Sequence, residues 1–143
     1  MDHDAFIGEV QHRAQLSSRG EAQEATRATL STLAERIQDG QAENLAAQLP
    51  EPLEGPLSGA GRTESFGPDE FVGRVAERDA SVGDGDEAVA DAAHHARVVF
   101  DVVDDAVTEG QFEDVRAGLP EEYGTLFELA ETEETPPEGE SNG

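Results

Sequence analysis

The chain has 143 residues, enough for one domain or two small ones. It carries 33 acidic and 9 basic residues, giving a net charge of −24, and it contains no cysteine. The missing cysteines exclude a disulfide framework, a thiolate metal site and a cysteine nucleophile. No apolar run approaches the roughly 20 residues that cross a membrane, and the first residues show no signal peptide. We therefore expect a cytoplasmic protein without a membrane segment.

The acidity has a compositional signature, because all 9 basic residues are arginine and lysine is absent. Acid enrichment with lysine depletion is similar to proteins of salt-in halophiles such as haloarchaea. Carboxylates hold water and cations, whereas lysine adds an apolar stem to the surface. At molar salt the Debye length falls to about 3 Å, which screens the repulsion between like charges. The composition predicts adaptation to high salt, and acidity for another reason is the alternative.

The N-terminal third of the chain has helical periodicity. Phe6, Val10 and Ala14 recur every four residues after Asp2, which is placed to cap the helix. The next predicted helix has Gly40 as its stop signal. Its apolar stripe consists of Leu30, Leu33, Ala34 and Ile37.

A second set of helices is predicted after residue 65. Pro68 begins a helix in which Phe66 and Phe71 form a hydrophobic staple. A longer helix follows, with Gly110 as its stop, and its apolar stripe consists of Val89, Ala93, Ala96, Phe100, Val103 and Val107. Each set continues into a short helix that a proline ends, and then into a final turn. The residues concerned are Leu45, Leu49, Pro50, Leu53 and Leu57, and then Val115, Leu119, Pro120, Tyr123 and Phe127.

The two sets align with each other, which indicates an internal repeat. A shift of 65 places Phe6 on Phe71 and Arg13 on Arg78, and a shift of 70 places Arg27 on Arg97. The shift changes in the loop 81–85. No window alternates as a strand does, so we predict an all-α fold of two tandem helical repeats packed as a pseudo-twofold bundle. The predicted units are repeat 1 (1–57), a linker (58–65), repeat 2 (66–127) and a disordered acidic tail (128–143).

Several of these segments together resemble a known family. They are the opening Asp-x-x-x-Phe-x-x-x-Val pattern, Ala25–Leu33, Gly40, Leu45–Pro50, Asp69–Phe71 and Asp114–Pro120. The chain is thereby similar, over residues 2–127, to the bacterial and archaeal family called domain of unknown function 2267. It departs from the pattern at Gly67, where a serine cap is expected, and in the loop near residue 84. The resemblance implies a duplicated all-helical domain and no activity, cofactor or catalytic residue.

Metal binding and catalysis find little support. Glu9 and His12 have Glu-x-x-His spacing, and Asp91 with His94 comes near it, but helical geometry turns these side chains away from the apolar faces. His95 lies at the edge of its stripe. No nucleophile elbow or phosphate-binding loop is present. We predict no catalytic, metal or cofactor site, and the alternative is a metal-dependent or other enzyme that uses surface acids and His94/His95.

The arginines are the remaining candidates. They are scattered among acids, so we expect no nucleic-acid binding. Arg13/Arg78 and Arg27/Arg97 each lie near the flank of an apolar stripe, where a stem can pack and a head can pair with an acid of a neighbouring helix. Alternatively, Arg27 and Arg97 are partner contacts. We predict a non-catalytic interaction or scaffold module whose partner is an unknown protein or a second copy.

Overall fold

A computed structural model describes residues 2–37, 39–49, 64–79, 82, 85–107, 111–119 and 123. These residues contain helices and no strand, so the all-α prediction is confirmed. The helices are α1 (His3–Ala14), α2 (Arg19–Arg36), α3 (Asp39–Gln48), α5 (Pro68–Arg78), α6 (Gly85–Ala106) and α7 (Gln111–Gly118).

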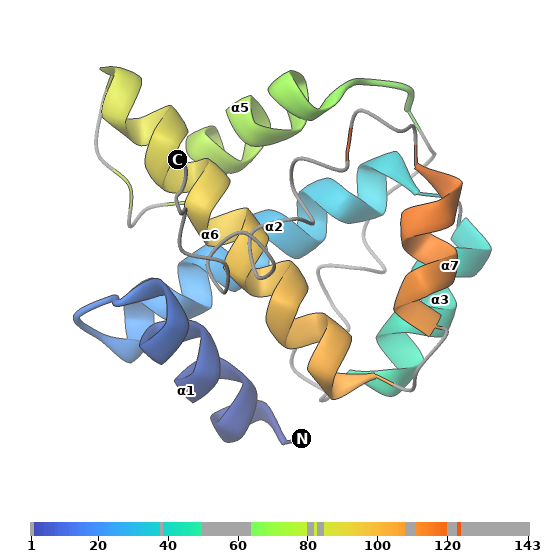
Figure 1. Ribbon diagram of the computed structural model, residues 1–143, viewed down its shortest axis with the longest axis horizontal. Coiled ribbons are helices and arrows are strands. Elements are labelled where there is room, and N and C mark those ends of the chain that lie inside the picture. Colours follow the sequence, from blue (N-terminus) through green and yellow to red (C-terminus); the bar gives the residue numbers. More distant parts are fainter. Residues whose placement is uncertain are drawn as a thin grey trace, which may run out of the picture.

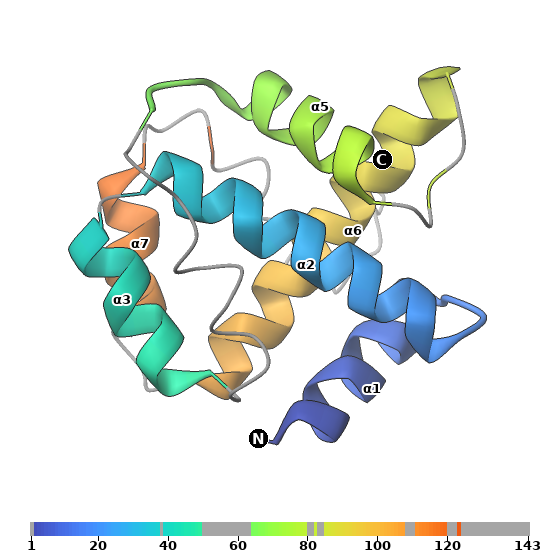
Figure 2. The ribbon, with the colours of Figure 1, turned by 180° about the vertical axis from the view of Figure 1, so that it is seen from behind.

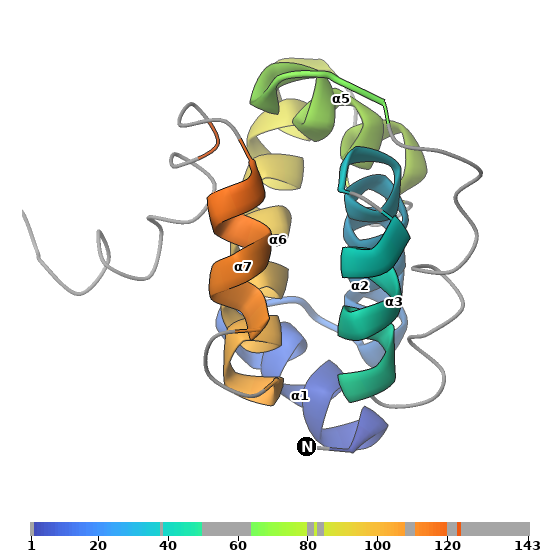
Figure 3. The same cartoon turned by 90° about the vertical axis from the view of Figure 1, so that its right-hand side faces the viewer.

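The two longest helices, α2 and α6, cross at the centre of the molecule (Figures 1 and 2). Helix α1 packs against both of them, and so does α5. Helices α3 and α7 lie side by side at one end (Figure 3). The central pair is therefore the layer on which the other helices assemble.

Local signals place the start of each of the first two helices. The Asp2 carboxylate accepts a hydrogen bond from the Ala5 N–H at 2.8 Å, as expected for the cap of α1. At α2 the Ser18 hydroxyl accepts from the Glu21 N–H at 3.2 Å, and the Glu21 carboxylate accepts from the Ser17 N–H at 3.0 Å. Reciprocal bonds of this kind satisfy amides that have no partner inside the helix. Gln15 ends α1 in the left-handed conformation, with φ 60°.

Helix α5 begins as the sequence predicts. Pro68 occupies the first turn, after Gly67, which provides no side-chain cap. The rings of Phe66 and Phe71 lie 6.4 Å apart, which confirms the hydrophobic staple.

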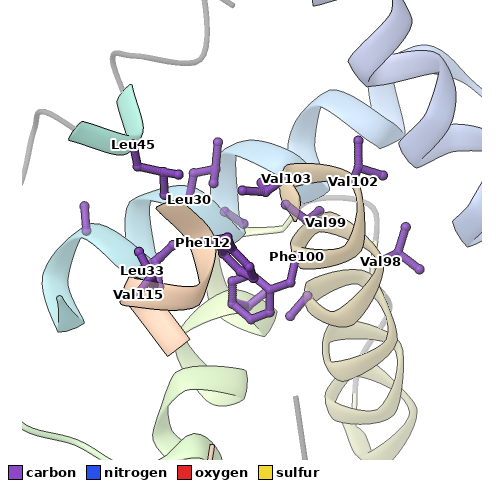
Figure 4. Close-up of a cluster of buried hydrophobic side chains, with 14 of the residues drawn as sticks. Leu30, Leu33, Leu45, Val98, Val99, Phe100, Val102, Val103, Phe112 and Val115 are labelled. Atoms are coloured by element: carbon purple, nitrogen blue, oxygen red, sulfur yellow. The ribbon is translucent and has the colours of Figure 1, made fainter. Parts of the chain in front are cut away.

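The core is one cluster to which every helix contributes. Figure 4 shows aliphatic side chains of α2, α3, α6 and α7 around Phe100 and Phe112, whose rings lie 5.9 Å apart. Each fully buried side chain of this size contributes about 1.5–3 kcal/mol. The predicted stripes of α1 and α2 are buried, but α2 is covered more widely than predicted. Its buried residues also include Ala22, Ala25, Thr26, Ala28, Thr29 and Thr32.

Two details of the helix predictions are wrong. Helix α2 ends at Arg36 because the buried Ile37 turns the chain into an extended conformation, and Gly40 lies inside α3 instead of stopping α2. Val89 is 51% exposed, because α5 covers a different side of α6. Among the described residues in the N-terminal half of α6, the buried ones are Ala88, Ala92 and His95, and buried Ala96 follows them.

Other expectations fall outside the described residues. They concern Leu53, Leu57, Gly110, Phe127, most of the linker 58–65 and the tail 128–143. The division into 1–57 and 66–127 stays a prediction.

Three buried threonines of α2 allow a test of the packing. The hydroxyls of Thr26 and Thr29 have no hydrogen-bond partner, whereas the Thr32 hydroxyl donates to the Ala28 carbonyl at 2.8 Å. A buried polar group without a partner costs about 1–3 kcal/mol. We expect Thr29→Val to raise the free energy of unfolding by about 1 kcal/mol and Thr32→Val to lower it by a similar amount. Chemical unfolding at constant salt measures both, and a destabilised Thr29→Val would contradict the assignment.

Candidate functional site

Arg13 connects α1 to α6. Its guanidinium donates to the carboxylates of Asp101 at 2.6 Å and Asp105 at 2.7 Å, while its Nε donates to Glu9 at 2.9 Å. Burial lowers the pKa of Arg13, but the hydrogen bonds with Asp105 and Glu9 outweigh it and raise the pKa above the ordinary value. The prediction that Arg13 pairs with an acid of a neighbouring helix is confirmed.

Glu35 connects α2 to α5. Its carboxylate accepts from Arg78 at 2.9 Å and from Arg74 at 2.8 Å, and Arg78 also donates to the Thr32 hydroxyl at 3.0 Å. Burial raises the pKa of Glu35, but the two guanidinium groups outweigh it and hold the pKa below its usual value. The structural interpretation of Arg78 is thus confirmed, whereas the part of Arg74 was not predicted.

A cation–aromatic cluster fixes the chain in front of α5. The Phe66 carbonyl accepts from Arg36 Nε at 2.8 Å and from the Tyr123 hydroxyl at 2.6 Å. The Arg74 guanidinium lies 4.0 Å from the centre of the Phe66 ring, within the range of a cation–π interaction. Only the spacing of Glu70 and Arg74, one helical turn apart, was readable from the sequence; the contacts of Arg36 and Tyr123 join segments far apart in the chain.

The structure places Arg27 on α2 and Arg97 on α6. The Arg27 side chain is 61% exposed, and its ion pair is with Glu24 of the same helix instead of an acid of a neighbouring helix. Arg97 lies at the corresponding position of α6 and is half-buried.

His95 and Asp79 form a buried pair that sequence reasoning missed. His95 Nδ1 lies 2.7 Å from the Asp79 carboxylate, and the two side chains are only 6% and 0% exposed. His94 is half-buried, with its ring centre 6.1 Å from that of His95. Within the described ranges, no group of three or more His, Asp or Glu side chains is arranged to hold a metal ion. The sequence contains one indication of this pair: His95 lies at the edge of the apolar stripe of its helix, 17 residues after the end of α5.

These contacts define a small all-helical protein whose helices are joined by a common core and by arginine–carboxylate pairs. The chain belongs to the family of uncharacterised conserved proteins DUF2267, whose model matches residues 3–126. No match was found among curated proteins. In the part of the chain that the structure describes, no helix has the length and apolar character to span a bilayer.

Glu35 gives a pH prediction. Because its pKa is lower in the folded state, its pairing contributes stability above the ordinary carboxylate range, and this contribution is lost as pH falls through the folded pKa. We expect Glu35→Gln to lower the free energy of unfolding by about 1–2 kcal/mol at neutral pH. The difference from wild type should shrink on acidification. Urea unfolding at a series of pH values, at constant salt, measures it, and a difference independent of pH would contradict the role of Glu35.

Proposed function

We propose that this protein is a non-catalytic interaction module and that Arg27 of α2 and Arg97 of α6 contact its partner. The observation that supports this proposal is the exposure and ion pairing of Arg27. Arg13, Arg74 and Arg78 join different helices, whereas Arg27 is mostly exposed and, among the described residues, pairs with Glu24 of its own helix. Its charge therefore adds little to the fold and is accessible to a protein partner or a second copy.

Substitution of the arginines separates recognition from folding. We expect Arg27→Gln to change the free energy of unfolding by no more than about 0.5 kcal/mol, as for most surface positions. Arg78→Gln should lower it by about 1–2 kcal/mol, because it leaves Glu35 with one cation fewer. Thermal unfolding in molar KCl measures both. A destabilisation by Arg27→Gln equal to that by Arg78→Gln would contradict the proposal.

Capture of a partner tests whether Arg27 and Arg97 take part in recognition. The Arg27→Gln/Arg97→Gln variant, used as bait in molar KCl, should lose a partner that wild type retains. Arg19→Gln is the matched control, because Arg19 is also exposed but joins α2 to Asp4 of α1. Equal capture by the double variant and wild type would count against recognition through these arginines.

We further propose that the protein works at high salt, as in the cytoplasm of a salt-in halophile of the haloarchaeal type. The net charge of −24 and the absence of lysine support this proposal. The interhelical ion pairs of Arg13 and Arg74 are partly exposed, so salt weakens them as it screens the repulsion. The gain must therefore come from screening the excess of acidic over basic residues, 33 against 9.

Lowering the salt tests this adaptation. We expect helicity and the unfolding temperature to fall as KCl decreases from molar concentration towards about 0.1 M, where the Debye length reaches about 10 Å. Circular dichroism at 222 nm measures the change. An unchanged spectrum over this range would overturn the adaptation.

The two halves of the chain are proposed to be a duplicated unit with pseudo-twofold symmetry. Arg13 of α1 pairs with Asp105 of α6, and Arg78 of α5 pairs with Glu35 of α2. A shift of 65 relates the two arginines, and a shift of 70 relates the two acids. Reciprocal pairs of this kind are what a twofold axis produces, because residue i then contacts j and j contacts i. The matching contacts of α1 with α6 and of α5 with α2 also support the duplication.

A further inference from the structure

Arg36 carries a charge that no ion pair within the described residues neutralises. Its Nε donates to the Phe66 carbonyl at 2.8 Å, and in the described part of the chain its guanidinium forms no second hydrogen bond. Other arginines do form ion pairs with acids, namely Arg13, Arg19, Arg27, Arg74, Arg78 and Arg116. In a chain with 33 acidic and 9 basic residues, a cation without an acidic partner is unexpected.

Arg36 lies where three parts of the chain meet. It is the last residue of α2, and the segment that leads into α5 runs beside it (Figure 2). In that segment the Glu64 N–H donates to the Glu35 carbonyl at 2.7 Å. Tyr123 reaches the same place from beyond the end of α7, where its hydroxyl donates to the Phe66 carbonyl at 2.6 Å. The surroundings of Arg36 are therefore set by the tertiary structure.

Two aromatic rings hold the guanidinium of Arg36 in place. Its Cζ lies 5.4 Å from the centre of the Tyr123 ring and 6.0 Å from that of the Phe66 ring, within reach of a cation–π interaction. Both rings belong to the core and pack against Phe71, with ring centres 5.9 Å away for Tyr123 and 6.4 Å for Phe66. A group that is ordered before binding loses less conformational entropy when it binds. Arg36 is preorganised in this sense, whereas the Arg27 side chain is 61% exposed.

The unused N–H groups of Arg36, on Nη1 and Nη2, are open to solvent. Arg36 is half-buried. Among the described residues, the side-chain atoms that are buried without a hydrogen-bond partner are the hydroxyls of Thr26 and Thr29, so the Nη atoms of Arg36 are not fully buried. A ligand can therefore approach these nitrogens while Nε stays on the Phe66 carbonyl.

The charges at this place indicate the class of ligand. Arg74, which lies over the same Phe66 ring, is already paired with three carboxylates. One cation therefore remains, and the two Nη groups of a guanidinium match the two oxygens of one carboxylate. A phosphate group carries about 1.5–2 negative charges, more than this cation neutralises. We propose that Arg36 is a binding site for a carboxylate of a ligand, which accepts parallel hydrogen bonds from Nη1 and Nη2.

The fold itself does not require an arginine at this position. Under the proposed duplication, a shift of 70 relates Arg36 to Ala106 of α6. The site is also separate from Arg27, because the nine residues between the two arginines make about 2.5 turns and place them on opposite sides of α2. Carboxylate binding at Arg36 and partner contact at Arg27 can therefore succeed or fail independently.

Nuclear magnetic resonance of the full chain tests the site by replacing chloride with a carboxylate. Potassium acetate replaces KCl stepwise at a constant molar concentration of potassium. The Nη signals of Arg36 should shift saturably and become resolved, because two hydrogen bonds slow the rotation of the guanidinium. Half-saturation should require severalfold less acetate than for Arg27, and Arg74 should not respond. An absent response of Arg36, or one equal to that of Arg27, would overturn the proposal.

A second titration distinguishes two sources of the carboxylate, a small organic acid and an acidic side chain of a protein. The probe is a blocked peptide with a single glutamate, used at the same carboxylate concentrations as acetate. Tighter binding of the peptide at Arg36 would support the site and assign it to a protein ligand, and tighter binding of acetate would support it and assign it to a small acid. Binding of neither would overturn the proposal.

Variants separate carboxylate binding from the structural contact with Phe66. A ligand that binds the folded state raises its stability, so acetate should raise the unfolding temperature of wild type more than that of Arg36→Gln or Arg36→Lys, which lack the planar pair of donors. Arg19→Gln, which removes an exposed arginine of α2, is the matched control and should gain as wild type does. Equal gains in wild type and both Arg36 variants would overturn the proposal. If neither variant folds, the wild-type titration decides.

Discussion

The crossing of α2 and α6 provides the surface against which α1 and α5 pack. Both helices are buried on the sides that face each other, and α1 and α5 each pack against both. A short helix such as α1 or α5 buries too little surface to be stable alone. The crossing offers each of them two helices to pack against. Small residues of α2, such as Ala22 and Ala28, permit the close approach of several neighbours to one helix.

The arginines reinforce this arrangement at its outer contacts. Arg13 joins α1 to α6, while Arg74 and Arg78 join α5 to α2 through Glu35. In a chain with a net charge of −24, these few cations lie where the acids of two helices come together. Surface pairs of this kind contribute little individually, but they prevent carboxylates from facing each other across a helix contact. Among the described side chains, the acids other than Asp79 are at least partly exposed, and salt screens this exposed charge.

The sequence predicted the positions of the helices better than it predicted which sides of each helix are buried. The spacing of Phe6, Val10 and Ala14 identified the buried side of α1, because one covered face is enough to produce a clear period. The same periodicity did not predict the full buried surface of α2, because three neighbouring helices cover most of its circumference. Its threonines are therefore buried with its alanines. Val89 was misplaced for a related reason: which side of α6 is covered depends on where α5 crosses it.

Local sequence patterns predicted the helical class, the cap Asp2, the start of a helix at Pro68, and the arginines that flank apolar stripes. These features depend on residues within one or two helical turns of each other, so a short stretch of sequence is enough to predict them. Three contacts followed from the tertiary arrangement alone: His95 meets Asp79, Tyr123 and Arg36 bind the Phe66 carbonyl, and Arg27 pairs with Glu24 of its own helix. The positions of these side chains depend on how whole helices cross. Helical periodicity predicts which face of a helix is apolar, but it does not predict which residues of other helices pack on that face.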